Sequence, residues 1–371
     1  MARFLFLALL PPPVHGISVI SSLVLSVLRG EDGRYQPEIH DIGQSNDLTD
    51  MGARRLMKAA RLLLVCVRLT LSRLWRGKAA FAYASLSPFG VARFRDAIII
   101  AVARRVSDRC LVHVHAQGLA TIMAGTTATD RLLRWCIKGA EILAITEATR
   151  ATALSVPGHF RKVWHLPNAI EDPGVTPHGR PAGPLRLTMV TNMAMDKGIV
   201  EFIEALVLLK QRGVGFQAAL VGAPSAGLSL ATVAGLIRAA GLDGVLALPG
   251  PLYDQDKHAI LHDSDIFAYP SRHDLAPLVV IEALAAGAVP VACDTGGIRE
   301  MMGPDLAENV LSTDGGTAAI AERLATRIGE LAADRAHLAG LSAISRQRYE
   351  QGFTTARFAA DFRAILAGPT A

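Results

Sequence analysis

Short apolar runs alternate with longer segments of helical periodicity along the whole chain. In the carboxy-terminal half, apolar runs lie at 185–190, 216–221, 245–248, 266–269 and 289–293. In the amino-terminal half, similar runs lie at 4–10, 81–85, 110–115, 142–146 and 163–166. Such runs, bounded by Gly, Pro or polar clusters, are typical of buried strands. Because they alternate with helical patterns, the sequence predicts an α/β protein with parallel sheets and crossover helices.

The chain divides where the apolar pattern stops. Residues 171–184 are rich in Pro and Gly and poor in apolar side chains, as interdomain linkers are. A length of 371 residues, 51% of them hydrophobic, is enough for two domains with their own cores. We predict an amino-terminal domain over 1–178, a carboxy-terminal domain over 179–350, and a final helix over 351–371 that packs back on the first domain.

The first ten residues are strongly apolar and resemble the core of a signal peptide. We favour a first buried strand, because Pro11 to Pro13 end the run and no small-x-small cleavage site follows closely. No run of about 18 uninterrupted apolar residues occurs, so no transmembrane helix is predicted.

Residues 54–78 contain eight Lys or Arg and no Asp or Glu, with apolar residues near helical spacing. A basic amphipathic helix of this kind can lie on anionic lipid. A helix packed on the core with a solvated basic face gives the same pattern, and both interpretations remain open. The net charge of +5 is mild, and no nucleic-acid partner is expected. The four cysteines lie far apart, as reduced thiols do, so we expect a cytoplasmic protein. If the basic helix lies on lipid, the protein is peripheral on the inner face of the cell membrane.

The stretch Ala268–Gly287 predicts a strand end, a turn and a helix. Pro270 stops the strand, Pro277 suits a first helical turn, and Gly287 suits a helix end. A helix that begins just after a strand offers free N–H groups to an anion. Ligands of open α/β sheets bind beyond the carboxyl ends of the strands. One rim of the second sheet should therefore carry Asn192, Lys197, Gly222, Gly250, residues 274–278, Gly296 and Gly297.

Several motifs occur in order along the second half. They are Lys197-Gly198 after a strand, the segment 250–257 beginning Gly-Pro-Leu-Tyr, the segment 265–271 ending Tyr-Pro-Ser, and Asp274 eight residues before Glu282. Over residues 185–303 the chain resembles the carboxy-terminal domain of glycosyltransferases of family four. Segments 11–16, 112–116 and 166–170 resemble that family more loosely. The resemblance implies the GT-B fold, with two Rossmann-like domains facing a central cleft. It also implies retaining transfer of a sugar from a nucleotide-diphosphate sugar to a polysaccharide, lipid-linked or other cell-surface acceptor.

The same resemblance implies roles for individual residues. Glu282 would hold the donor ribose and Lys197 would neutralise the diphosphate. Asp274 stands where the family has a glutamate facing the sugar, and Asn192 stands in place of an arginine. His115 would lie near the reacting sugar and the acceptor. The catalytic candidates are His115, Asp274 and Lys197, and the donor-binding candidates are Gly16, Asn192, Lys197, Gly222, Gly250, Pro251, Ala276, Pro277, Leu278 and Glu282.

No metal or other cofactor is expected. Asp263 and Asp265 form a D-x-D pair, but the first closes a predicted helix and the second opens a predicted strand. His113 and His115 point to one face of a strand, with no third metal ligand nearby in the sequence. Two other functions compete with transfer. One is a weakened GT-B protein that acts as a binding or scaffolding subunit. The other, a dinucleotide-dependent oxidoreductase, is disfavoured because no G-x-G-x-x-G follows strand one or the strand at 185–190.

Overall fold

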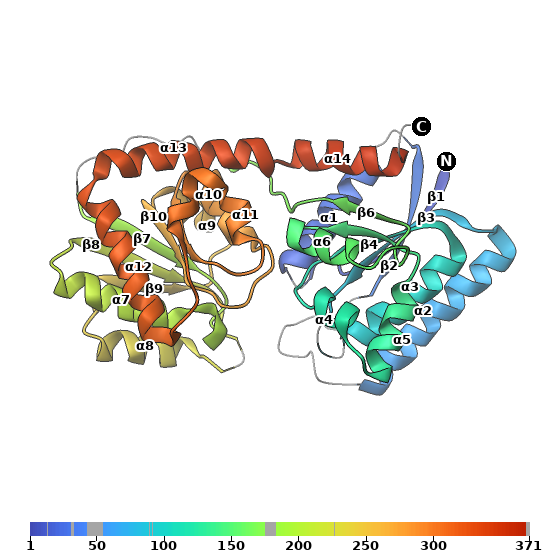
Figure 1. Ribbon diagram of the computed structural model, residues 1–371, viewed down its shortest axis with the longest axis horizontal. Helices are drawn as coiled ribbons and strands as arrows, with labels where there is room; N and C mark the ends of the chain where they lie inside the picture. The colour runs from blue at the N-terminus through green and yellow to red at the C-terminus, as the bar shows by residue number, and fades with distance from the viewer. Residues whose placement is uncertain are drawn as a thin grey trace. The chain divides into compact units, whose positions relative to one another are not determined.

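The computed structural model describes residues 1–12, 14–30, 33–42, 55–88, 90, 92–174, 183–225 and 227–368 (Figure 1). The chain forms two compact units. The first contains Met1–Asn168 together with the residues from Ala356 onward, and the second contains Ala169–Thr355. The predicted boundary between 178 and 179 lies outside the described residues.

The described strands of the first unit form one six-stranded parallel sheet in the order β2-β1-β3-β4-β5-β6. Their bounds are β1 Ala2–Ala8, β2 Tyr35–Asp41, β3 Ala79–Leu86, β4 Ser107–Val114, β5 Glu141–Ala144 and β6 Lys162–His165. The strand expected at the start of the chain is β1, and residues 4–8 are fully buried. In the middle of this core the rings of Phe6 and Tyr83 stack 5.1 Å apart.

The polar segment after residue 33 contains a strand, β2, that the sequence pattern did not predict. Among the described strands it pairs with β1 alone, at the edge of the sheet. Tyr35 is buried whereas Gln36 and Ile39 are exposed, so the strand shows little of the apolar run that marks a central strand. Pro37 is tolerated because an edge strand has one side with no ladder to complete.

Helices cover both faces of this sheet. They are α1 Gly16–Arg29, α2 Arg55–Arg76, α3 Ala92–Val106, α4 Leu119–Ala124, α5 Ala128–Ile137, α6 Glu147–Leu154 and, from the end of the chain, α14 Thr355–Ala367. α2 packs beside α3, and α3 packs beside α5 (Figure 1).

α14 is fixed to the first unit by Arg109 of β4. The guanidinium donates to the main-chain carbonyls of Ile365 and Leu366 at 2.8 and 2.9 Å, and it pairs with the buried carboxylate of Glu141 at 2.7 Å. A cation on the last carbonyls of a helix is favourable because those groups lack helical partners. The segment predicted as one final helix, 351–371, contains the end of α13 (Arg335–Gly352) and then α14, which begins at Thr355.

The described strands of the second unit form another six-stranded parallel sheet, in the order β12-β11-β10-β7-β8-β9. Their bounds are β7 Leu185–Val190, β8 Phe216–Val221, β9 Leu246–Gly250, β10 Ile266–Tyr269, β11 Val289–Cys293 and β12 Val310–Leu311. The helical segments are η2 Met195–Lys197, α7 Ile199–Gln211, α8 Leu230–Ala239, α9 Asp254–His262, α10 Leu278–Ala285, α11 Ile298–Met302, η3 Pro304–Asn309, α12 Gly316–Ala333 and α13. The chain runs outward from β7 in one direction and then restarts at β10 on its other side. The topological switch point therefore lies between β7 and β10, where ligands of such sheets bind.

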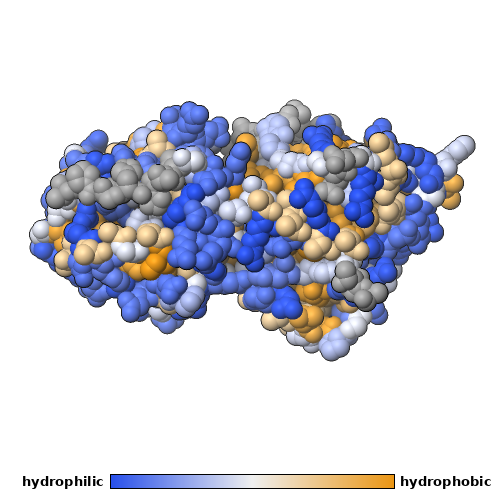
Figure 2. All heavy atoms as spheres, turned by 90° about the horizontal axis from the view of Figure 1, so that it is seen from above, coloured by the Kyte–Doolittle hydropathy of each residue, from blue (hydrophilic) through white to orange (hydrophobic). Residues whose placement is uncertain are grey.

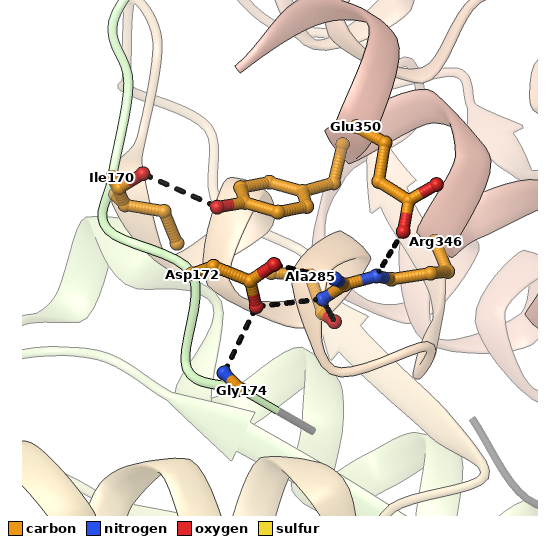
Figure 3. A network of polar contacts seen from close by, with 7 residues as sticks. Ile170, Asp172, Gly174, Ala285, Arg346 and Glu350 are labelled. Carbon is orange, nitrogen blue, oxygen red and sulfur yellow. Dashed lines mark hydrogen bonds and ion pairs between the residues drawn. The ribbon is translucent and has the colours of Figure 1, made fainter. Parts of the chain in front are cut away.

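A polar network holds the first residues of the second unit to α13 (Figure 3). Arg346 pairs with Asp172 and Glu350 and donates to the carbonyl of Ala285. The hydroxyl of Tyr349 donates to the carbonyl of Ile170 at 3.3 Å, and the amide of Ile170 donates to Phe353 at 3.1 Å. These contacts hold together the two ends of the second unit, the segments near residues 169 and 355.

The surface mixes hydrophobic and hydrophilic side chains, and Figure 2 shows hydrophobic atoms reaching the surface in several places. Many of the large apolar side chains that are exposed lie on α2. Among the described helices, none is long and apolar enough to cross a membrane.

Candidate functional site

Two glycines lie at the carboxyl edge of the second sheet, just where β8 and β9 end. The amide of Gly222 donates to the carbonyl of Gly250 at 3.0 Å. A Cβ at Gly222 would lie 1.6 Å from the carbonyl oxygen of Thr191, so only glycine lets the β7 and β8 loops approach this closely. Because the strands are parallel, both glycines lie at the same edge of the sheet, where they were predicted.

Lys197 and Asp274 form an ion pair at the topological switch point. Lys197 ends the short helix η2 after β7, and Asp274 lies in the loop between β10 and α10. The ammonium lies 2.9 Å from both carboxylate oxygens and 2.9 Å from the carbonyl of His273. The hydroxyls of Tyr269 and Ser271 donate to Asp274 Oδ2 at 2.8 and 2.6 Å. Both charged side chains keep about a fifth of their surface exposed, at 21% and 20%, so solvent reaches the pair.

The loop that carries Asp274 is packed between two other backbone segments. Gly198 has φ +83°, and a Cβ there would lie 2.3 Å from the carbonyl oxygen of Pro270. Gly296 has φ +55°, and a Cβ there would lie 2.2 Å from the carbonyl oxygen of Asp274. Because glycine adopts positive φ without strain and adds no side chain, these two positions allow the close packing that fixes the loop.

Glu282 lies on the second turn of α10 and is almost buried, with 9% of its surface exposed. Lys257 of α9 donates to its Oε1 at 2.7 Å. Its Oε2 is buried and has no hydrogen-bond partner among the described residues. A buried carboxylate oxygen without a donor is costly, which makes this atom a candidate acceptor for a ligand hydroxyl.

The remaining candidates of the second unit surround these groups. Asn192 and Pro251 are exposed in the loops after β7 and β9, and Ala276, Pro277 and Leu278 are half-buried at the start of α10. Pro277 is the N-cap rather than the first helical residue, and no side chain caps this helix. Gly287, with φ +72°, follows the end of α10 as predicted.

Three polar residues of this site were not predicted as members. Lys257, Tyr269 and Ser271 lie inside the recognised motifs, but the sequence gives no sign that their side chains meet Glu282 and Asp274. The partners are 25, 5 and 3 residues apart. Lys257 reaches Glu282 because α9, which precedes β10, packs against α10, which follows it.

In the first unit, His115 follows the end of β4. Its Nε2 is buried without a hydrogen-bond partner among the described residues, and burial and the neighbouring His15 lower its pKa to about 3. The imidazole is therefore neutral near pH 7 and can accept or donate a hydrogen bond without carrying charge. Gly16 begins α1, next to the N-cap His15, whose ring accepts from the amide of Ser18 at 3.2 Å. Because His15 lies near enough to His115 to lower its pKa, the start of α1 must lie close to the end of β4.

The neighbouring His113 is fully buried. Its Nδ1 lies 2.9 Å from the hydroxyl of Tyr83, and its ring centre lies 4.1 Å from that of His115. Burial, more than the nearby His115, lowers the pKa of His113 well below its usual value, so two neutral rings lie against each other with their planes tilted by 42°.

The D-x-D pair has structural partners. Asp263 pairs with Arg186 at 3.0 Å, and Asp265 accepts from the amide of Arg186 at 2.8 Å. Within the described ranges, no group of three or more His, Cys, Asp or Glu is placed to hold a metal ion.

Residues 176–337 match the glycosyl transferases group 1 family. WcaL of Escherichia coli (strain K12), assigned to colanic acid biosynthesis as a glycosyltransferase, is 30% identical over 179 residues, which are 47% of this chain and 42% of WcaL. The GDP-mannose-dependent alpha-mannosyltransferase of Mycolicibacterium smegmatis is 25% identical over 61% of this chain and 52% of its own length. The chain thus spans about half the length of these relatives.

The fold is shared with solved structures over the whole chain. Sucrose-phosphate synthase from Thermosynechococcus elongatus has a TM-score of 0.71 with 17% identity, and each chain is covered completely. HepE of Anabaena, solved in complex with UDP and glucose, has a TM-score of 0.70 with 16% identity and the same coverage. The two Rossmann-like units are those of the GT-B fold, as the resemblance implied.

Proposed function

Since residues 176–337 match the glycosyl transferases group 1 family, we propose that the protein is a retaining glycosyltransferase. It would move a sugar from a nucleotide-diphosphate sugar to a polysaccharide, lipid-linked or other cell-surface acceptor. The observation that carries the proposal is the unpartnered Oε2 of Glu282 at the switch-point rim. A ribose hydroxyl would give this buried oxygen the donor that it lacks, while Lys257 holds the other oxygen. The relatives support a nucleotide-sugar donor, because one is named for GDP-mannose and a neighbour binds UDP-glucose.

The chemistry requires charge stabilisation at the leaving group. Breaking the bond between sugar and diphosphate places growing negative charge on the diphosphate, and preorganised donors aimed at that charge contribute most to the rate. Lys197 supplies a cation, and the start of α10 supplies main-chain N–H groups that no side chain caps. We propose that these groups act without a metal ion or other cofactor. On the first unit, neutral His115 would hydrogen-bond the transferred sugar or the acceptor.

The competing hypothesis is a GT-B protein that binds but scarcely transfers. It rests on Asn192 and Asp274, which replace the arginine and the glutamate of the family's pattern. An amide donates without charge assistance, so one contribution to the leaving diphosphate is weaker.

The experiment is a donor screen followed by turnover. UDP-glucose and GDP-mannose would be tested for a rise in melting temperature, since a ligand that binds only the native state raises it. Hydrolysis or transfer would then be compared for the natural protein, Glu282→Gln and the control Glu204→Gln on α7. Glu282→Gln should lose a charged hydrogen bond worth about 1.5–3 kcal/mol, which weakens donor binding roughly 10- to 150-fold. Glu204→Gln should bind the donor as the natural protein does. Binding without turnover would favour the scaffold, and no binding to any nucleotide sugar would defeat the enzyme proposal.

We further propose that α2 holds the enzyme peripherally on the anionic inner face of the cell membrane. α2 uses one side for the core: Leu69 is 1% exposed, and Leu62 and Val65 pack against the same cluster. The opposite side is also apolar, with Leu63 65%, Leu74 75% and Trp75 87% exposed.

The exposed residues of α2 form one stripe. At about 100° per residue, positions 63, 64, 67, 71, 74 and 75 fall within an arc of about 120°, and Leu69 points directly away from it. Exposed Arg61 and Arg68 flank this stripe on one side and Arg73 on the other, and α2 contains no acidic residue. Apolar side chains between arginines match the boundary between lipid headgroups and acyl chains, and the positive charge matches anionic lipid.

A further inference from the structure

Asp274 is surrounded by donors from its own protein. Its carboxylate receives the ammonium of Lys197 on both oxygens, and Oδ2 also receives the hydroxyls of Tyr269 and Ser271. An ionised carboxylate offers about four acceptor sites. Three of the four contacts converge on Oδ2, so a sugar hydroxyl that approaches Asp274 would compete with donors that are already in place.

Lys197 is equally occupied. An ammonium has three N–H donors, and here the acceptors are Asp274 Oδ1, Asp274 Oδ2 and the carbonyl of His273, each at 2.9 Å. A lysine amine on a flexible four-carbon stem loses much rotamer freedom when it is held in this way. The pair therefore fixes the position of the cation before any ligand binds, and a diphosphate oxygen that accepts a hydrogen bond from it would replace one of these three acceptors.

The backbone keeps Asp274 from reaching outward. Gly198 packs against Pro270 on one side of the loop and Gly296 packs against the carbonyl of Asp274 on the other. The amide of Gly297 also donates to the carbonyl of Leu275 at 2.6 Å. With its loop held at both flanks, an aspartate, one methylene shorter than glutamate, stays beside Lys197.

We propose that Asp274 is a positioning residue that holds the ammonium of Lys197 for the donor diphosphate, rather than a residue that contacts the transferred sugar. This inference rests on the proposed function for the identity of the ligand. The pairing itself is independent of any ligand. Tyr269 and Ser271 support this role, since their hydroxyls fix the orientation of the Asp274 carboxylate.

The first test needs no nucleotide. Acetic anhydride labelling followed by mass spectrometry would compare Lys197 with Lys210, an exposed lysine of α7, in the same sample. Asp274→Asn is expected to raise the labelling rate of Lys197 at least fivefold relative to Lys210. The matched variant Asp243→Asn, on an exposed loop of the same unit, leaves the ratio unchanged. An unchanged ratio in Asp274→Asn would overturn the proposal.

The second test separates the diphosphate from the sugar. Dissociation constants for UDP and UDP-glucose, and for GDP and GDP-mannose, would be measured by calorimetry. A positioning role predicts that Asp274→Asn changes the constants of a nucleotide and its sugar derivative by the same factor. The proposal would be overturned if only the dissociation constant of the sugar nucleotide rose. It would also be overturned if neither dissociation constant changed.

Asp274→Glu is a second variant that keeps the negative charge, so it is less prone to a folding defect than Asp274→Asn. Its side chain has the length of the glutamate in the family's pattern. The positioning role predicts no gain in affinity that is specific to the sugar nucleotide, whereas such a gain would assign this carboxylate to the sugar. If the natural protein binds none of the four ligands, the proposed function fails for these donors and the role toward the diphosphate fails with it. The labelling result would still decide whether Asp274 holds Lys197.

Discussion

The exposed stripe of α2 allows the membrane proposal to be tested on a single side chain. Leu74 is 75% exposed on the side of the helix away from the core, so Leu74→Ala should leave the fold intact. Replacing leucine by alanine removes three carbons, worth about 0.8 kcal/mol each when buried. Scaled by the exposed fraction, insertion of Leu74 into lipid is worth about 1.8 kcal/mol, and the variant should partition roughly 20-fold less strongly.

The assay is flotation with vesicles of phosphatidylcholine alone or mixed with phosphatidylglycerol. Leu154→Ala is the matched control, because Leu154 is 51% exposed at the end of α6, away from the stripe. Arg61→Gln with Arg68→Gln tests the charge. At about 1 kcal/mol for each arginine near an anionic surface, this pair should weaken binding about 30-fold on anionic vesicles at low salt. High salt should abolish most of that difference.

Three results would refute the reasoning. The natural protein could fail to float with anionic vesicles, Leu74→Ala could lose no more binding than Leu154→Ala, or the arginine variants could bind as before. A concentration-dependent dimer in light scattering, lost in Leu74→Ala, would instead assign the stripe to a second copy of the chain.

Three further predictions concern the interior of the two units. Gly296→Ala combines a left-handed φ, which costs about 1–2 kcal/mol for other residues, with a clash against the carbonyl of Asp274, so it should weaken nucleotide binding by displacing that loop, as calorimetry would detect. Arg109→Met leaves the carboxylate of Glu141 buried without its cation and should destabilise the first unit by about 3–5 kcal/mol, with faster amide exchange in α14; unchanged exchange would contradict it. Burial depresses the pKa of His115 to about 3, so between pH 6.5 and 3 the unfolded state binds more protons than the folded state. Stability should therefore fall as the pH drops, by about 1.4 kcal/mol per pH unit from this residue, and His115→Asn should flatten the slope in acid denaturation.

The order of strands and helices could be predicted because burial on both faces of a parallel sheet imposes continuous apolar runs. β7, β8 and β10 begin and end where the runs predicted. β2 was missed for the same reason, since an edge strand with one neighbour is half solvated and its polar sequence resembles a loop. The interruption of the helix near Phe353, between α13 and α14, was also not predicted, because helical periodicity continues on both sides of it.

The sequence by itself determined that charged and small residues follow successive strands, and parallel order then places Lys197, Gly222, Gly250 and Asp274 on one rim. The tertiary structure decided which of them touch. Pairing between Lys197 and Asp274, or between Lys257 and Glu282, depends on the two sides of the switch point meeting, and sequence distance carries no information about that contact. The tertiary structure likewise decided which apolar side of α2 is buried at Leu69 and which is left in solvent, because periodicity reports an apolar face without naming its partner.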